Sequence, residues 1–437
     1  MLTRPHRGIE CIRKGKVLAV LNVLHWSAMR PVVADGRVEW KEETGARELP
    51  VIFQRTGETW SEANLWARHL AAHNHAKTVR RSVDHLCAYA TWLEEENLTW
   101  WHFPPFEKDR CLVRYRGALK QARDRGELAP STTSHRMAAV IRFYRWASSV
   151  KLISPDWPMW IDRIVGIRLE NQFGLQHTLS VQSTNLAIPN RKVAGAFLLE
   201  DGLMPVSSNE MQQILKLADQ FASQELALML RLGFGTGMRL GSICELKLRT
   251  FENAQRCPIL GDAGWWRLSI GPSARPPVPT KFGVSGSVLI PFDLLELARD
   301  YVHNTRRLKR EAQADEENRA LLLLTRFGKP YAGQDSRAVN VEMSRLRRAG
   351  IAEGVDVMRD FHFHRSRATF LTQLMRAALS CLPVADAVDF VREVALHKDS
   401  STTLKYVKFV ETTKAMGTAA NAFTEAFMGS QMDPKNA

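Results

Sequence analysis

Residues 395–409 read A-L-H-K-D-S-S-T-T-L-K-Y-V-K-F. This segment places His397 nine residues before Tyr406, with a run of four serines and threonines at 400–403 between them. Serine and threonine are preferred at helix starts, so the run predicts a helix that carries the tyrosine. Tyrosine is scarce, with six in the whole chain. Tyr406 could pack beneath a C-terminal helix or act as a nucleophile, and the rest of the sequence has to distinguish these roles.

The chain carries a large positive charge. Its 437 residues include 60 Lys and Arg against 46 Asp and Glu, a formal net charge of +14. This balance favours a polyanionic partner, with nucleic acid ahead of an anionic membrane surface. No apolar run approaches the ~20 residues of a membrane span. The six cysteines are dispersed without a C-x-x-C pair, so we expect free thiols in a reducing compartment and a cytoplasmic protein.

Hydrophobic periodicity divides the chain into four parts. Residues 1–47 form an appendage of unknown role, in which the run 17–24 is interpreted as a buried strand and not as a signal peptide. Residues 48–165 place apolar side chains three and four apart, as in 78–96 and 131–147, which predicts helices. Residues 166–204 lose this period and are interpreted as a linker.

Residues 205–437 are again mostly helical in pattern. Two β-like runs, 265–270 and 287–291, flank a proline-rich loop, and helices follow to the end. The predicted fold class is therefore mainly α with a small antiparallel β-sheet. The length agrees with two or three domains.

A glycine-rich segment, G-F-G-T-G-M-R-L (233–240), matches no nucleotide-binding pattern. Its glycines do not fit G-x-G-x-x-G, no G-K-[ST] follows, and a helical pattern precedes it where a strand is required. The remaining feature is a glycine break followed by Arg239 at the start of a new helix. A guanidinium beside a helix N-terminus can bind an anion; the alternative is an ordinary surface arginine.

A second segment, F-H-F-H-R-S-R-A-T-F-L-T (361–372), pairs histidine with arginine in two registers. His362 with Arg365 and His364 with Arg367 both satisfy H-x-x-R. The H-x-H pattern also suggests a metal, but no carboxylate or cysteine ligand lies close in the sequence. We therefore predict no metal site here.

One lysine, Lys281, lies on the loop between the two β-like runs, with no other lysine between Lys247 and Lys309. A lysine at a hairpin tip is usually solvated, although it can also reach into a groove. Arginine, lysine, histidine and tyrosine together suit metal-independent attack on a phosphodiester, because guanidinium groups bind two phosphate oxygens at once. Ionising a phenol of pKa near 10 at pH 7 costs about 4 kcal/mol, which a histidine or the cationic cluster must offset.

These motifs, in this order, resemble those of the tyrosine recombinase, or phage integrase, family. T-G-M-R-L-G-S-I-C-E-L (236–246) resembles its first arginine box. H-R-S-R-A-T-F (364–370) resembles its H-x-L-R-H-T-F box, a match that selects His364 and Arg367. A-L-H (395–397) resembles its L-G-H box, and the spacing from His397 to Tyr406 agrees with the family. The resemblance covers about 48–437.

The resemblance implies six catalytic residues: Arg239, Lys281, His364, Arg367, His397 and Tyr406. Tyr406 would attack the scissile phosphate and leave a 3′-phosphotyrosyl link with a free 5′-hydroxyl. The two arginines would hold the non-bridging oxygens, and the lysine would protonate the leaving 5′-oxygen. His364 would act as general base or as a base-like hydrogen-bond partner of the tyrosine, and His397 would support the phosphate.

The resemblance also implies the partners. A helical, SAM-like core-binding domain (48–165) and an α+β catalytic domain (205–437) would bind double-stranded DNA as a homo-tetramer on two DNA sites. Accessory DNA-bending or directionality proteins are possible partners, and no metal, ATP or other cofactor is needed. The implied protein is a nucleoid-associated site-specific recombinase of a bacterial mobile element, located in the cytoplasm. The alternatives are a non-catalytic sequence-specific DNA-binding relative and a type IB topoisomerase-like enzyme.

Four departures from the family pattern support the non-catalytic alternative. Ser242 stands where an acidic residue usually follows the first arginine. Leu396 replaces the glycine of L-G-H, and Ala368 replaces the second histidine of its box. The proline-rich loop before Lys281 is longer than usual. The C-terminal segment, 411–428, could dock on a neighbouring protomer, as in the family, or pack on its own domain.

Overall fold

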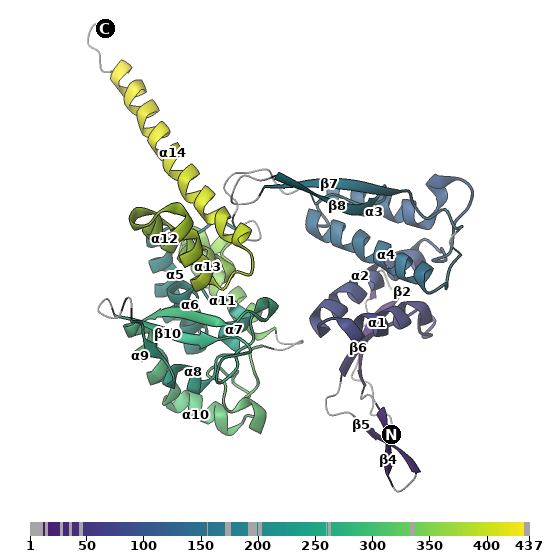
Figure 1. The fold of residues 1–437 in the computed structure, drawn as a ribbon, viewed down its shortest axis with the longest axis horizontal. Helices are drawn as coiled ribbons and strands as arrows, with labels where there is room; N and C mark the ends of the chain where they lie inside the picture. The colour runs from purple at the N-terminus through teal and green to yellow at the C-terminus, as the bar shows by residue number, and fades with distance from the viewer. Residues whose placement is uncertain are drawn as a thin grey trace. The chain divides into compact units, whose positions relative to one another are not determined.

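The structure is a computed structural model (Figure 1). It describes residues 12–13, 16–26, 29–34, 37–42, 47–154, 156–170, 176–190, 199, 203–258, 260, 264–332 and 337–431. The chain forms two compact units, Met1–Ala194 and Gly195–Ala437. Helices dominate both units, and the sheets are small and antiparallel, which confirms the predicted fold class.

Unit 1 is a helical bundle with short sheets attached. Its helices are α1 (Ser61–His73), α2 (Ala76–Glu95), α3 (Cys111–Asp124) and α4 (Pro130–Ser149), with the 3₁₀ helix η1 (Glu107–Asp109). Its strand pairs are β1 (Ile12–Arg13) with β2 (Lys16–Val17), β3 (Val20–Trp26) with β6 (Arg47–Phe53), β4 (Met29–Ala34) with β5 (Arg37–Glu42), and β7 (Asp162–Glu170) with β8 (Gln176–Thr184). The helices predicted over 78–96 and 131–147 correspond to α2 and α4.

The core of unit 1 is built from aromatic side chains on the apolar helix faces. Trp60 and Trp66 both pack edge-on against Phe143, with ring centroids 5.3 and 5.9 Å away. The Tyr89 and Tyr144 hydroxyls hydrogen-bond to each other at 2.9 Å within this core. Because the aromatic rings come from three segments, their burial holds the helices together.

Two parts of unit 1 differ from the sequence interpretation. The run 17–24 is buried only at its start, since Leu18 and Ala19 are buried while Leu24 is 45% exposed. The Ala19 amide donates to the Glu94 carboxylate of α2 at 2.7 Å, so this segment belongs to the helical unit and is not separate from it. The predicted linker contains most of the β7–β8 hairpin. The division between the units, after Ala194, lies inside that linker, and the predicted domain boundaries stay predictions.

Unit 2 surrounds a three-stranded antiparallel sheet with helices. The strands, in the order β11-β10-β9, are β9 (Gln255–Arg256), β10 (Trp265–Ile270) and β11 (Gly286–Pro291). The α-helices are α5 (Ser208–Phe221), α6 (Gln224–Thr236), α7 (Leu240–Cys244), α8 (Leu248–Glu252), α9 (Phe292–Val302), α10 (Thr305–Ala312), α11 (Ala338–Ala352), α12 (His364–Cys381), α13 (Val384–Ala395) and α14 (Ser400–Gln431). Among the described residues, these are connected by the 3₁₀ helices η4 (Lys281–Gly283), η5 (Glu316–Asn318) and η6 (Asp356–Arg359). Strands β10 and β11 correspond to the two predicted β-like runs.

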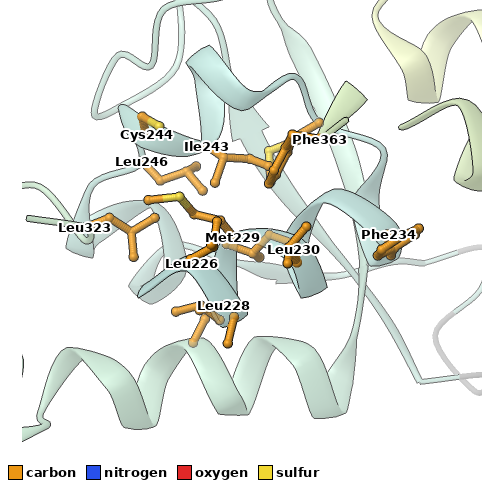
Figure 2. Packing of buried hydrophobic residues seen from close by; sticks show 14 of the residues in the cluster. Leu226, Leu228, Met229, Leu230, Phe234, Ile243, Cys244, Leu246, Leu323 and Phe363 are labelled. Atoms are coloured by element: carbon orange, nitrogen blue, oxygen red, sulfur yellow. The ribbon is translucent and has the colours of Figure 1, made fainter. Parts of the chain in front are cut away.

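Helix α6 lies at the centre of unit 2. Figure 2 shows Met229 and Leu230 of this helix among the buried side chains that face Ile243 and Leu246. Ser223 caps the helix by accepting from the Leu226 amide. Because α6 is enclosed on several sides, its C-terminal end is held in a fixed position from which the first arginine segment begins.

The carboxylate of Glu225 lies inside this core. Glu225 is fully buried; it accepts from Tyr301 Oη at 2.6 Å and Arg306 Nε at 2.9 Å and pairs with Arg310 at 2.9 Å. Burial raises the pKa of Glu225, but the hydrogen bonds and the arginine charges outweigh it and hold this pKa below its ordinary value. The network joins α6 to α9 and α10.

Among the helices of the described residues, none has the length and hydrophobicity that a membrane span requires.

Candidate active site

The first arginine segment depends on a glycine. Helix α6 ends at Thr236, and its C-cap is Gly237, whose φ of +65° is left-handed. A Cβ at this position would collide with the ring of Phe370 on α12. Glycine is therefore required both by the backbone conformation and by the close approach of α12. Two residues later, half-buried Arg239 is the N-cap of α7.

Arg367 joins the segments that the sequence motifs single out. Its side chain on α12 is only 3% exposed. One terminal nitrogen donates to the Gly237 carbonyl at 2.6 Å, and the other donates to the Ala395 carbonyl at 2.9 Å. A planar guanidinium can make such divergent bonds in a fixed geometry. The backbone just before Arg239 and the backbone just before His397 are thus tied to one side chain.

The other histidine–arginine register has a different role. Arg365 is also buried, but it donates to the Met204 carbonyl at 2.9 Å and to the Asp360 carboxylate at 2.6 Å. His362 is exposed, whereas His364 is half-buried at the first turn of α12. Arg365 therefore fastens α12 to the start of unit 2, and Arg367 faces the other motifs.

His397 and Tyr406 lie beside each other. The His397 imidazole is buried, and its Nδ1 is 2.9 Å from Thr403 Oγ1 on α14. The rings of His397 and Tyr406 stack with centroids 6.1 Å apart and an interplanar angle of 23°. Tyr406 has 0% exposure. Thr403 is a contact that sequence reasoning missed, although its position one helical turn before Tyr406 was an available signal.

Leu396, the residue that replaces a glycine, has a left-handed backbone with φ 50° and ψ 49°. Its side chain is buried against β11, where a Cβ on Gly286 would come within 2.5 Å of Leu396 Cδ2. The leucine therefore fills space that a glycine on the strand leaves open. Ala368, the other replaced position, is buried in the apolar cluster that also contains Tyr406.

Lys281 is exposed at the tip of the loop between β10 and β11. Its Nζ lies 5.3 Å from the ring centroid of Phe282, a 71% exposed side chain on a left-handed residue (φ 67°). The lysine is thus presented on the surface of unit 2, whereas Arg367, His397 and Tyr406 are buried.

In the described part of the chain, no group of three or more His, Cys, Asp or Glu is arranged to hold a metal ion.

The chain is similar to one family model and to several solved structures. Residues 206–412 match the model described as the phage integrase family. A lambda integrase dimer bound to a COC′ core site is similar in structure at 14% identity, covering 79% of this chain and 94% of that one with a TM-score of 0.45. The Tn1549 transposon integrase in complex with circular intermediate DNA is similar with the same identity and coverage and a TM-score of 0.48. No curated protein matches the chain.

Proposed function

We propose that the protein is a site-specific tyrosine recombinase of a mobile genetic element, a proposal supported by the match of residues 206–412 to the model of the phage integrase family. It cuts and rejoins DNA through a 3′-phosphotyrosyl intermediate. The observation that carries the assignment of residues is the bridge made by Arg367, which binds the carbonyls of Gly237 and Ala395. This bridge supports the proposal that the first arginine segment, the second box and the histidine–tyrosine segment form one site.

The proposed chemistry begins at the tyrosine. The phenolic oxygen of Tyr406 attacks the scissile phosphorus while the bond from phosphorus to the 5′-oxygen breaks. His364 takes the phenol proton, and Lys281 gives a proton to the departing 5′-oxygen. The phosphodiester becomes a phosphotyrosyl ester of similar energy, so the reverse attack by a 5′-hydroxyl rejoins a strand without ATP.

The cations stabilise the transition state. Arg239 and Arg367 hold the two non-bridging oxygens, whose negative charge grows during the attack. Arg367 is already oriented by the backbone carbonyls of Gly237 and Ala395. His397, held by Thr403, supports the phosphate from the side of α14.

The proposed partner is double-stranded DNA, which the net charge of +14 favours. From the family we also propose a homo-tetramer on two DNA sites, with accessory DNA-bending proteins. Such an enzyme would act where the chromosome lies, at the nucleoid in the bacterial cytoplasm. Binding should weaken steeply with salt, because phosphate contacts release counterions.

The decisive test is covalent capture on DNA. The protein is incubated with nicked suicide duplexes from the ends of its genomic neighbourhood, and an SDS-resistant protein–DNA band is sought. Tyr406→Phe should abolish the band and keep the gel-retardation shift. Tyr331→Phe is the matched control, since the hydroxyl of this buried tyrosine donates to the Glu342 carboxylate at 2.9 Å.

Two outcomes would favour the alternatives. A clean retardation shift with no covalent band for the wild type, on any duplex, would indicate a non-catalytic DNA-binding protein. Relaxation of supercoiled plasmids without a specific sequence, together with a band lost in Tyr406→Phe, would indicate a topoisomerase-like enzyme.

A further inference from the structure

Ser242 connects the first arginine segment to the lysine loop. Its backbone amide donates to the Arg239 carbonyl at 2.9 Å within the first turn of α7. Its hydroxyl donates to the Pro279 carbonyl at 2.9 Å, and the side chain is buried. Pro279 lies two residues before Lys281. One small residue therefore links the backbone of a phosphate-binding arginine to the backbone that presents the lysine.

The chemistry of this contact requires a donor at position 242. A backbone carbonyl only accepts hydrogen bonds, and an ionised carboxylate also only accepts. The acidic residue usual in the family at this position could not make the contact without first taking up a proton. The serine is therefore suited to this loop in a way that aspartate or glutamate is not.

The other hydrogen bonds around the lysine lie within the loop itself: Thr280 Oγ1 donates to the Val284 carbonyl at 2.5 Å, and the Gly283 amide donates to the Thr280 carbonyl at 3.2 Å. Gly271 and Val278 bond each other at 2.9 and 3.2 Å and close the first half of the loop. The Ser273 amide donates to Ser285 Oγ at 3.0 Å near the strands. Between Val278 and the 3₁₀ turn at Lys281, the Ser242 bond fixes the chain to a helix of the core.

We propose that Ser242 is a positioning residue for Lys281, which holds the loop so that the lysine reaches the leaving 5′-oxygen. This inference rests on the proposed recombinase chemistry and deepens it. The departure from the family's acidic residue is then an adaptation to the long proline-rich loop, and it does not indicate a lost activity. Ser242 bonds the backbone next to both Arg239 and Lys281. A shift of the loop would therefore change the rate of the cleavage step directly.

The test uses a leaving group that needs no proton. In a duplex whose scissile 5′-bridging oxygen is sulfur, attack by Tyr406 forms the oxygen–phosphorus bond, breaks the phosphorus–sulfur bond and releases a thiolate. A thiol has a pKa of about 8.5, far below that of an alcohol, so the thiolate leaves without the lysine. Lys281→Ala should therefore lose cleavage of the oxygen duplex and retain cleavage of the sulfur duplex.

Ser242→Ala should show the same pattern in weaker form. We expect cleavage of the oxygen duplex to slow about five- to tenfold, which is the effect expected from the loss of one hydrogen bond. Cleavage of the sulfur duplex should stay within about twofold of wild type, because the lost contact acts only through the acid. Ser242→Thr should restore most of the rate on the oxygen duplex, and Ser242→Asp should be at least as slow as the alanine variant.

The matched control is Thr372→Ala. This removes a buried hydroxyl whose bond, to the Ala368 carbonyl at 2.7 Å, stays within α12, and both duplexes should be cleaved normally. An equal loss on both duplexes for Ser242→Ala would overturn the inference, because a merely structural role affects both. A wild-type protein that forms no adduct on either duplex would refute the proposed function and this inference with it.

Discussion

Leu396→Gly tests whether packing or backbone strain decides the residue at the end of α13. A left-handed conformation costs a non-glycine residue about 1–2 kcal/mol, which glycine would recover. The leucine side chain is buried against Gly286, and removing a buried leucine costs about 2–5 kcal/mol. The loss of packing therefore exceeds the relief of strain. We expect Leu396→Gly to lower the free energy of unfolding by about 1–3 kcal/mol, even though glycine suits the backbone.

Leu396→Ala separates packing from strain. Alanine loses the packing and keeps the strain, so the expected order of stability is wild type, then Leu396→Gly, then Leu396→Ala. Pulse proteolysis across a urea gradient, following the fragment of unit 2, measures the free energy of unfolding for each variant. A Leu396→Gly protein more stable than wild type would refute the reasoning, because strain would then exceed packing.

A double-mutant cycle provides the control. Gly286→Ala should destabilise the wild type, because the new Cβ would lie 2.5 Å from Leu396 Cδ2. In the Leu396→Gly background the leucine is absent, and the same change should cost much less. A coupling free energy of about 1 kcal/mol or more is expected. Strict additivity would show that the two residues do not share this space.

Three further predictions concern single positions. Glu225→Gln should destabilise unit 2 by about 3–5 kcal/mol in urea unfolding, because it leaves Arg310 buried beside a neutral amide. Burial lowers the pKa of His85 from 6.5 to about 4, so the folded state holds this imidazole neutral. Stability from this group is complete above pH 6.5 and is lost as the pH falls toward 4, and His85→Asn should flatten the pH dependence of unit 1 unfolding seen by tryptophan fluorescence. Gly237→Ala should lower both the unfolding midpoint and covalent capture, because the Cβ collides with Phe370; an unchanged midpoint would contradict the close packing of α12.

Much of this architecture could be predicted from periodicity and motif order. The helices α2 and α4 and the strands β10 and β11 follow local patterns of apolar residues, which depend on neighbours in the chain. The β7–β8 hairpin was missed because a two-stranded ribbon with an interior glycine, Gly166, shows little regular alternation. The strand β3 was expected to be buried throughout, but it is an edge of a two-stranded sheet and its far end is exposed.

The site itself depends on contacts that local sequence does not contain. From the sequence, Leu396 is only a departure from the glycine of its motif. The structure shows that its side chain occupies the space left by Gly286, which lies more than a hundred residues earlier in the chain. Ser242 likewise looks like a missing acid until the Pro279 carbonyl is seen beside it. The motifs located the candidate residues, but their partners could be found only in three dimensions.

The burial of Tyr406 has a kinetic consequence. In the proposed reaction, Tyr406, which has 0% exposure, can attack a phosphate only after the segments that cover it have moved. The observed rate is then the intrinsic rate multiplied by the fraction of molecules in the open form. In the proposed reaction, each 1.4 kcal/mol that favours the form with Tyr406 covered would slow the cleavage of DNA by about tenfold. In the proposed reaction, the binding of the correct DNA would supply the free energy that exposes Tyr406.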